Sequence, residues 1–175
     1  MSREETLVHE VEQMPDIDSL PRNSRHCFAL GIARMASGAT LRLPVNILAG
    51  MTARPRLVVV AGVHGAEYEG IVATYDLWRE LDPANLAGTV VMVPVANPPA
   101  FLALQRRNPT DDVDMNRIFP GDPAGSITAR LAYRLFNDVV LGADMLLSMH
   151  GFAGSSSISP YVEYPRDTPV TDASR

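Results

Sequence analysis

Continuous apolar runs along the chain predict strands that are buried on both faces. The runs at residues 56–61 and 89–95 are rich in β-branched side chains, which is typical of strands covered by helices on either side. A third run, at 143–149, predicts another buried strand. Residues 40–49 alternate apolar and polar positions imperfectly, as a half-buried strand would.

Helical periodicity fills the segments between these strands. Residues 67–81 place Ile71, Leu77 and Trp78 on one face and predict an amphipathic helix. The other expected elements are strands at 28–34 and 158–164, helices at 98–106 and 127–140, a loop at 108–125, and an arm at 1–26 with a short helix or strand. This alternation predicts an α/β fold with a mixed, largely parallel sheet and helices on both faces.

One domain is expected, because 175 residues suffice for a single hydrophobic core. Residues 1–50 would form an N-terminal arm and strands of this domain, and residues 51–175 its metal-binding α/β core. A net charge of −5 argues against a nucleic-acid surface. The polar N-terminus has no apolar signal-peptide core and no run is long enough for a membrane span, so we expect a cytoplasmic protein without a membrane partner.

His64, Glu67 and His150 are the candidate metal ligands. His64 and Glu67 follow the run at 56–61 and are spaced to share the first turn of a helix, while His150 follows the run at 143–149. Ligands gather at the carboxyl ends of such strands. Two imidazoles and one carboxylate are the donor set of a catalytic zinc site, so we expect one Zn²⁺ per chain. The alternative for His64 and Glu67 is a first helical turn whose carboxylate compensates the helix dipole. The alternative for His150 is a histidine buried in the core.

Three segments carry a resemblance to a known family. They are Gly-Val-His-Gly-Ala-Glu at 62–67, Asp-Met-Asn-Arg-Ile-Phe-Pro-Gly at 114–121, and Met-His-Gly at 149–151. In this order they resemble the succinylglutamate desuccinylase/aspartoacylase family, relatives of the zinc carboxypeptidases. The resemblance implies a zinc carboxypeptidase-like fold and a zinc-dependent amidohydrolase, a deacylase acting on an N-acyl amino acid or related small amide.

The second segment contains the expected substrate-binding pair. In the resembled family, the residues matching Asn116 and Arg117 hold a substrate carboxylate, which suits the planar guanidinium. The alternative is a loop arginine paired with Asp112 or Asp114. Upstream, Arg106 or Arg107 could stabilise an oxyanion, with Arg107 the chosen candidate and a solvated helix end the alternative.

Two departures from the family pattern affect the expected activity. Ser148 stands where members commonly carry an Asp, and Asp144 lies too far along the strand to replace it. No general base is identified, because Glu163 is the only glutamate after His150 and lies in an unrelated segment, where we expect a strand or surface residue.

The chain therefore looks C-terminally truncated relative to the family. We expect a complementing C-terminal segment or a homo-oligomer as possible partners, besides the small-molecule substrate. The rival interpretations are a zinc carboxypeptidase and a non-catalytic, truncated metal-binding remnant.

Overall fold

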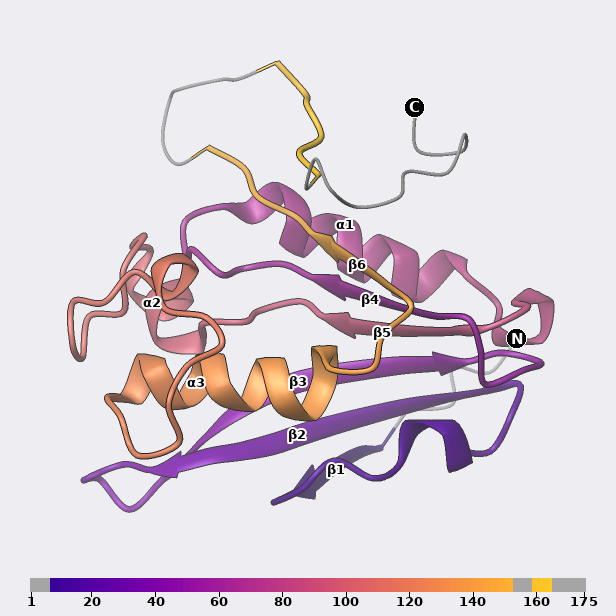
Figure 1. The fold of residues 1–175 in the computed structure, drawn as a ribbon, viewed down its shortest axis with the longest axis horizontal. Helices are drawn as coiled ribbons and strands as arrows, with labels where there is room; N and C mark the ends of the chain where they lie inside the picture. The colour runs from indigo at the N-terminus through magenta and orange to yellow at the C-terminus, as the bar shows by residue number, and fades with distance from the viewer. Residues whose placement is uncertain (1–6, 153–158, 165–175) are drawn as a thin grey trace.

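A six-stranded sheet forms the centre of the computed structural model, which describes residues 7–152 and 159–164 (Figure 1). The strands are β1 (Val8–Val11), β2 (Ser24–Arg34), β3 (Thr40–Ala49), β4 (Arg56–Val60), β5 (Thr89–Val93) and β6 (Met145–Ser148). The helices are α1 (Tyr68–Glu80), α2 (Pro98–Ala103) and α3 (Ile127–Leu135), with short helical turns η1 (Ile17–Ser19), η2 (Pro83–Asn85), η3 (Met115–Arg117) and η4 (Phe136–Val140).

The strand order is β1-β2-β3-β5-β4-β6, and the pairing is mixed. β4 lies between β5 and β6 and is parallel to both, with Val58 opposite Val91 on one side and Leu146 on the other. β1 is parallel to β2, whereas β3 is antiparallel to both β2 and β5. These pairings confirm the predicted mixed, largely parallel sheet.

Helices cover both faces of the sheet, as the alternating pattern predicts. On one face, Val58 and Val60 of β4 pack in a core with Leu131 and Leu135 of α3. On the other face, Val59 packs with Leu48 and Met92, against which Leu77 and Trp78 of α1 lie. The β-branched runs form strands here because both faces of β4 and β5 are buried.

The parallel strands β4 and β6 end at the same edge of the sheet, and the chain emerges there toward the candidate ligands. After β4 the backbone turns at Gly62, whose φ of +64° is a left-handed conformation that glycine adopts without strain. After β6 the N–H of Met149 still donates to the carbonyl of Val60 at 2.8 Å, which keeps the following residue beside β4. Chain topology therefore brings segments far apart in sequence to one edge.

Two sequence predictions are wrong in part. The strand at 143–149 exists as β6, but all four of its residues are exposed, because β6 is the edge strand and only β4 pairs with it. The predicted strand at 158–164 is absent from its described part, residues 159–164, which are exposed and have no strand neighbour. In that segment Pro160 also lacks the N–H that a strand pairing needs. No helix in the described ranges is long and apolar enough to cross a membrane.

Candidate metal centre

The carboxylate of Glu67 holds the two candidate histidines together. Its Oε1 lies 2.7 Å from Nδ1 of His64, and its Oε2 lies 2.9 Å from Nδ1 of His150. The N–H of Gly151 also donates to Oε2, at 3.1 Å. The sequence prediction that these three side chains meet is thus matched in space, although His150 is 83 residues from Glu67.

Burial makes this cluster chemically distinct from surface carboxylates. His64 is only 2% exposed and Glu67 only 7% exposed. Burial by itself would raise the pKa of Glu67, but hydrogen bonds from His150, His64 and the Gly151 N–H outweigh it and lower the pKa to about 2. Glu67 is therefore an anion at neutral pH, with both oxygens directed at imidazole nitrogens.

The donor set fits a divalent transition metal. One ligand atom from each of His64, Glu67 and His150 lies within 4.8 Å of the others. Two imidazole nitrogens and a carboxylate oxygen leave a fourth position open in a tetrahedral site, which distinguishes catalytic zinc sites from closed, thiolate-rich structural sites. A cavity of about 170 Å³ adjoins the cluster, and its lining includes Ala66, Arg106 and Phe152.

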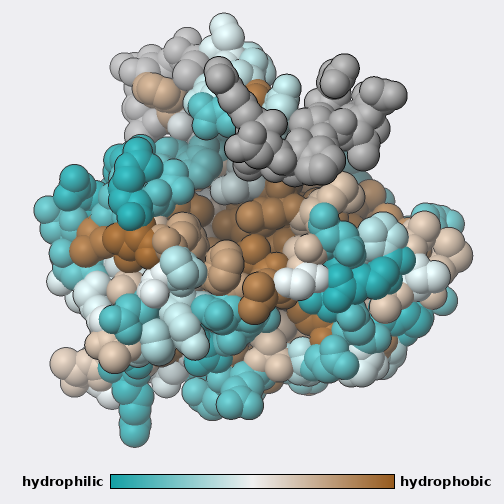
Figure 2. All heavy atoms as spheres, viewed as in Figure 1, coloured by the Kyte–Doolittle hydropathy of each residue, from teal (hydrophilic) through white to brown (hydrophobic). Residues whose placement is uncertain are grey.

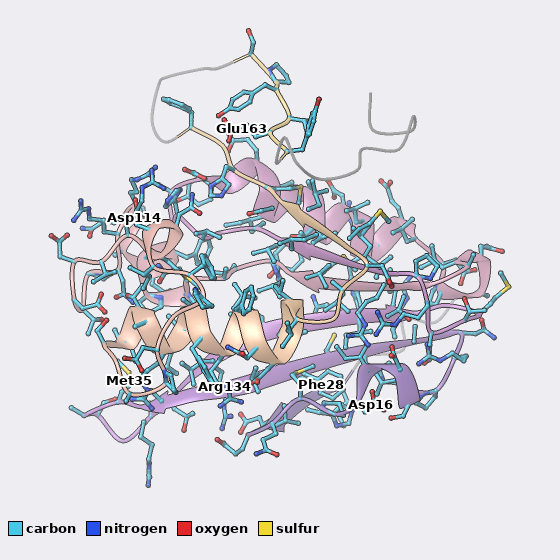
Figure 3. All side chains as sticks on the ribbon, in the orientation of Figure 1. Asp16, Phe28, Met35, Asp114, Arg134 and Glu163 are labelled. Atoms are coloured by element: carbon cyan, nitrogen blue, oxygen red, sulfur yellow. The ribbon has the colours of Figure 1, made fainter. Side chains whose placement is uncertain are left out.

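Asp114 orients His64 from the side away from Glu67. Its Oδ1 lies 3.1 Å from Nε2 of His64, and its Oδ2 accepts a hydrogen bond of 3.0 Å from Nε of Arg106. Figure 3 shows Asp114 on the loop beside α2. A carboxylate on the outer nitrogen of an imidazole fixes the ring and its tautomer and makes the inner nitrogen a better metal ligand. Burial would raise the pKa of Asp114, but hydrogen bonds from His64 and the Asn116 N–H lower it.

From the sequence, Asp114 is expected only as a salt-bridge partner for Arg117. The available signal was its position two residues before Asn116, inside the same family segment. That proximity could not reveal the contact with His64, which lies 50 residues upstream.

A second aspartate, Asp111, fastens the loop that carries Asp114 to helix α3. Its Oδ1 accepts from the hydroxyl of Thr128 at 2.7 Å, and its Oδ2 accepts from the Thr128 N–H at 2.9 Å. The same carboxylate accepts from the Val113 N–H at 3.3 Å. Asp111 thereby ties the start of α3 to the residue immediately before Asp114, and sequence reasoning missed this role.

Glycine at position 65 is required by close packing between the site and α2. A Cβ built on Gly65 would lie 2.0 Å from the backbone carbon of Ala100. The N–H of Gly65 also donates to the carbonyl of Gln105 at 2.8 Å. The segment between His64 and Glu67 is thus held directly against the backbone of α2, where any side chain would force the two apart.

The two arginines proposed for oxyanion stabilisation lie in different places. Arg106 lines the cavity, and its Nη1 is 3.9 Å from Oε1 of Glu67. Arg107, the residue chosen from sequence, instead donates to the backbone carbonyl of Asp112 at 3.0 Å and lies 3.5 Å from its carboxylate. The geometry therefore favours Arg106 for contact with a bound molecule.

The predicted substrate pair is exposed and close to the site. Asn116 and Arg117 lie in η3, directly after Asp114, and both are exposed. Within the described part of the chain, Arg117 forms no ion pair, since Asp112 lies against Arg107 and Asp114 against Arg106. The structure therefore does not contain the alternative salt bridge from Arg117 to Asp112 or Asp114.

The structure also shows the surroundings of Ser148, Asp144 and Glu163, the residues connected with the departures from the family pattern. The hydroxyl of Ser148 is 3.4 Å from Nε2 of His150, so it is a weak partner for this imidazole. Asp144 lies near the opposite end of β6, where it accepts from the Arg56 N–H at 2.7 Å. Glu163 is exposed and lies on the separate segment 159–164, where Figure 3 labels it. It forms no hydrogen bond or ion pair with the other described residues.

Comparison with known proteins places this site in a family. A sequence model of the succinylglutamate desuccinylase/aspartoacylase catalytic domain matches residues 53–173, which include all three candidate ligands. The N-alpha-acetyl-L-2,4-diaminobutyric acid deacetylase of Halomonas elongata is 37% identical over 107 residues, 61% of this chain and 31% of that protein.

Solved structures of similar fold point to the same family. The succinylglutamate desuccinylase/aspartoacylase of Rhodobacter sphaeroides has a TM-score of 0.71 and 33% identity over 79% of this chain. The product-bound ectoine utilization protein EutE (DoeB) of Ruegeria pomeroyi has a TM-score of 0.69 and 28% identity over 76% of this chain. In both cases the match spans only 42% of the other protein. With the match to the catalytic domain covering most of its length, this chain belongs to the succinylglutamate desuccinylase/aspartoacylase family.

Proposed function

We propose that this chain is part of a zinc-dependent deacylase that hydrolyses the amide bond of an N-acyl amino acid. The observation that carries the proposal is the convergence of the buried His64 and Glu67 with the exposed His150 on one point beside a cavity. A zinc ion held by these residues would supply Lewis-acid catalysis, polarising the scissile carbonyl. Hydrolysis would consume one water and release a carboxylate and an amine.

The chain's own residues have distinct parts in this proposal. Asp114 keeps the imidazole of His64 in one orientation, and Glu67 supplies fixed negative charge at the site. Arg106 is placed at the cavity wall to donate hydrogen bonds to the carbonyl oxygen as negative charge develops on it. Arg117, which has no carboxylate partner among the described residues, would bind the substrate carboxylate, and Asn116 would add an amide hydrogen bond.

The choice of substrate class rests on the relatives. The Halomonas elongata protein is named as a deacetylase of an N-acetylated diamino acid, so N-alpha-acetyl-L-2,4-diaminobutyrate is the first compound to assay. Peptide hydrolysis from the C-terminus, the zinc carboxypeptidase alternative, calls for a second substrate panel of short peptides.

Metal binding is the first test. Elemental analysis of zinc-replete protein is expected to find about one zinc per chain, because three protein ligands suffice for a catalytic-type site. The double variant His64→Ala, His150→Ala should lose the metal. The control double variant His9→Ala, His26→Ala changes two histidines outside the site and should keep it. Unchanged zinc content in the first variant would refute the ligand assignment.

Activity is the second test. Zinc-dependent release of amine from N-acetyl amino acids, lost in the His64→Ala, His150→Ala variant, is the expected result. Faster cleavage of peptides than of N-acyl amino acids would favour the carboxypeptidase. Zinc binding without turnover of either panel, even when the rest of the family domain is supplied, would favour a non-catalytic metal-binding domain.

A further inference from the structure

A second cavity lies between the N-terminal segment 12–16 and helix α3. Its volume is about 750 Å³, and its lining shares no residue with the cavity at the metal centre. Segment 12–16 and Ile32 of β2 form one wall, and residues of α3 and η4 between Arg130 and Asp138 form most of the other. Small-molecule sites commonly have volumes of about 300–1,000 Å³, so this cavity is large enough to hold a ligand.

Hydrogen bonds from two arginines of α3 hold the walls in place. Nη2 of Arg134 donates to the carbonyl of Glu12 at 2.6 Å, and Nη2 of Arg130 donates to the carbonyl of Ile32 at 3.2 Å. Helix α3 is thereby attached both to the N-terminal segment and to β2. The cavity is therefore formed by the fold itself, without a bound ligand, as most small-molecule sites are.

Two charged groups of the lining have no partner of opposite charge among the described residues. Arg130 uses one N–H on Ile32, which leaves the other N–H groups of its planar guanidinium for a carboxylate. The carboxylate of Asp16 accepts only from the Asp18 N–H, at 3.1 Å, within that part of the chain. The site thus offers a cation and an anion that nothing else in the described structure neutralises.

The other charged groups of the lining already have neighbours of opposite charge. Arg134 forms an ion pair with Asp138, and Oε1 of Glu12 lies 3.7 Å from Nη1 of Arg42. Hydrophilic residues predominate in the lower part of the face drawn in Figure 2, where β1 and η1 lie below α3 in Figure 1. A ligand for this cavity is therefore expected to be polar and to meet Arg130 and Asp16.

The two unpaired charges are separated along the cavity. Figure 3 places Asp16 to the right of Arg134, toward the end at which α3 continues into η4. Arg130 lies one turn, about 6 Å, nearer the start of α3 than Arg134. A ligand that meets both must carry a carboxylate and an ammonium group joined by a chain. Met14 and Ile32 contribute apolar lining for such a chain.

We propose that this cavity binds an amino acid with a cationic side chain, at a site separate from the metal centre. Arg130 holds the α-carboxylate, and Asp16 accepts hydrogen bonds from the side-chain ammonium group. A compound with only one of these two groups leaves the other charge of the site without a partner and binds more weakly. The inference uses no metal ligand and holds whether or not the metal centre is catalytic.

The test is a titration of the ¹⁵N-labelled, full-length chain with L-lysine, followed by ¹H–¹⁵N NMR. We expect saturable shifts of amides in residues 12–16 and 130–138 and none in residues 64–67. L-norleucine lacks the side-chain ammonium group of lysine, and cadaverine lacks its carboxylate. Each should bind at least about tenfold more weakly than lysine, because one charged hydrogen-bonding group is lost.

The arginine is tested with Arg130→Gln, which removes the charge but keeps a donor for the carbonyl of Ile32. This variant should bind lysine at least about tenfold more weakly. Arg34→Gln is the matched control, because Arg34 is exposed at the end of β2 and does not line the cavity. It should bind lysine as the wild type does.

The aspartate is tested with Asp16→Asn, which keeps an acceptor for the Asp18 N–H that caps η1. Lysine binding should again weaken at least about tenfold. Asp82→Asn is the matched control, since Asp82 caps η2 in the same way, through the Ala84 N–H, and does not line the cavity.

Several results would overturn the proposal. One is the lack of saturable shifts at both segments up to about 10 mM lysine, which is weaker than a specific site should bind. Others are shifts confined to residues 64–67, equal binding of norleucine or cadaverine, and equal affinities of Arg130→Gln and Arg34→Gln. The comparison of the three ligands uses the wild type, so it decides the matter even if a variant does not fold.

Discussion

At the scale of single residues, the Asp114 carboxylate is expected to affect zinc affinity through the orientation of His64. Asp114→Ala is expected to lower zinc affinity about 10- to 100-fold, because His64 loses the partner that fixes its ring. Asp112→Ala is the matched control, since Asp112 is on the same loop and its carboxylate contacts only Arg107 among the described side chains. Competition with a chromophoric chelator measures both affinities, and equal values would contradict the role given to Asp114.

Arg106 and Arg107 form a natural pair for testing the catalytic proposal. Arg106→Ala should lower kcat for an N-acyl amino acid about 10²- to 10³-fold, because it removes a donor aimed at developing charge. Arg107→Ala should have a small effect, since this side chain lies on Asp112 and away from the cavity. Steady-state kinetics of both variants, measured on a preparation whose wild type hydrolyses the substrate, shows which arginine contributes to kcat. A larger loss for Arg107→Ala would restore the choice made from sequence.

At the scale of elements, the loop before η3 depends on its attachment to α3 through Asp111. Burial acts to raise the pKa of Asp111, but hydrogen bonds from the Ser126 side chain and from Thr128 outweigh it, so the pKa lies below its ordinary value of 3.8. Folding therefore favours the ionised form. The resulting stability is fully present above pH 3.8 and is lost as the pH falls through the lower pKa of the folded state.

The prediction is a change in the pH dependence of stability. Asp111→Asn should lower the free energy of unfolding by about 1–3 kcal/mol at pH 7, the usual range for hydrogen bonds to a charged group. Its stability should also fall less than that of the wild type between pH 5 and about pH 3, because the variant has no carboxyl to protonate there. Urea unfolding at several pH values measures this. Asp122→Asn is the control, because among the described residues the Asp122 carboxylate accepts only from the nearby Ala124 N–H. Parallel pH profiles for wild type and Asp111→Asn would contradict the prediction.

At the scale of the whole molecule, the two ends of the parallel strands have different chemistry. The amino ends of β4 and β6 are joined by ion pairs, with Arg56 at 2.5 Å and Arg54 at 3.0 Å from Asp18, and Arg54 at 3.1 Å from Asp144. Hydrogen bonds from Arg56 lower the pKa of Asp18. The carboxyl ends lead into His64 and His150. Asp144 thus serves the end of β6 opposite to the metal centre, which is why it cannot replace the aspartate that the family carries near the third ligand.

The apolar edge at β6 belongs to the same scale. Only the arrangement of all six strands shows that β6 is at an edge, because its sequence is as apolar as that of the central strands. The run at 143–149 therefore predicts a strand correctly, whereas its predicted burial is wrong for β6.

The sequence by itself determined strands β2 to β6, helices α1 to α3 and the three candidate ligands, whereas the strand expected at 158–164 does not form in its described residues 159–164. Continuous β-branched runs form β4 and β5 because burial on both faces selects such residues, and His64, Glu67 and His150 stand out because they follow the ends of strands. These signals are local: each depends on a short segment and its periodicity. The chemistry of the donor set is likewise a property of the residue types.

Only the tertiary structure decided which neighbours act on those residues. Asp114 reaches His64 across 50 positions and Asp111 reaches Thr128 across 17, and no local pattern encodes either contact. Arg106 and Arg107 are adjacent and chemically identical, so the sequence could not tell which one faces the cavity. The turn of the chain after α2 makes that choice, because it directs one guanidinium toward Glu67 and the other toward Asp112.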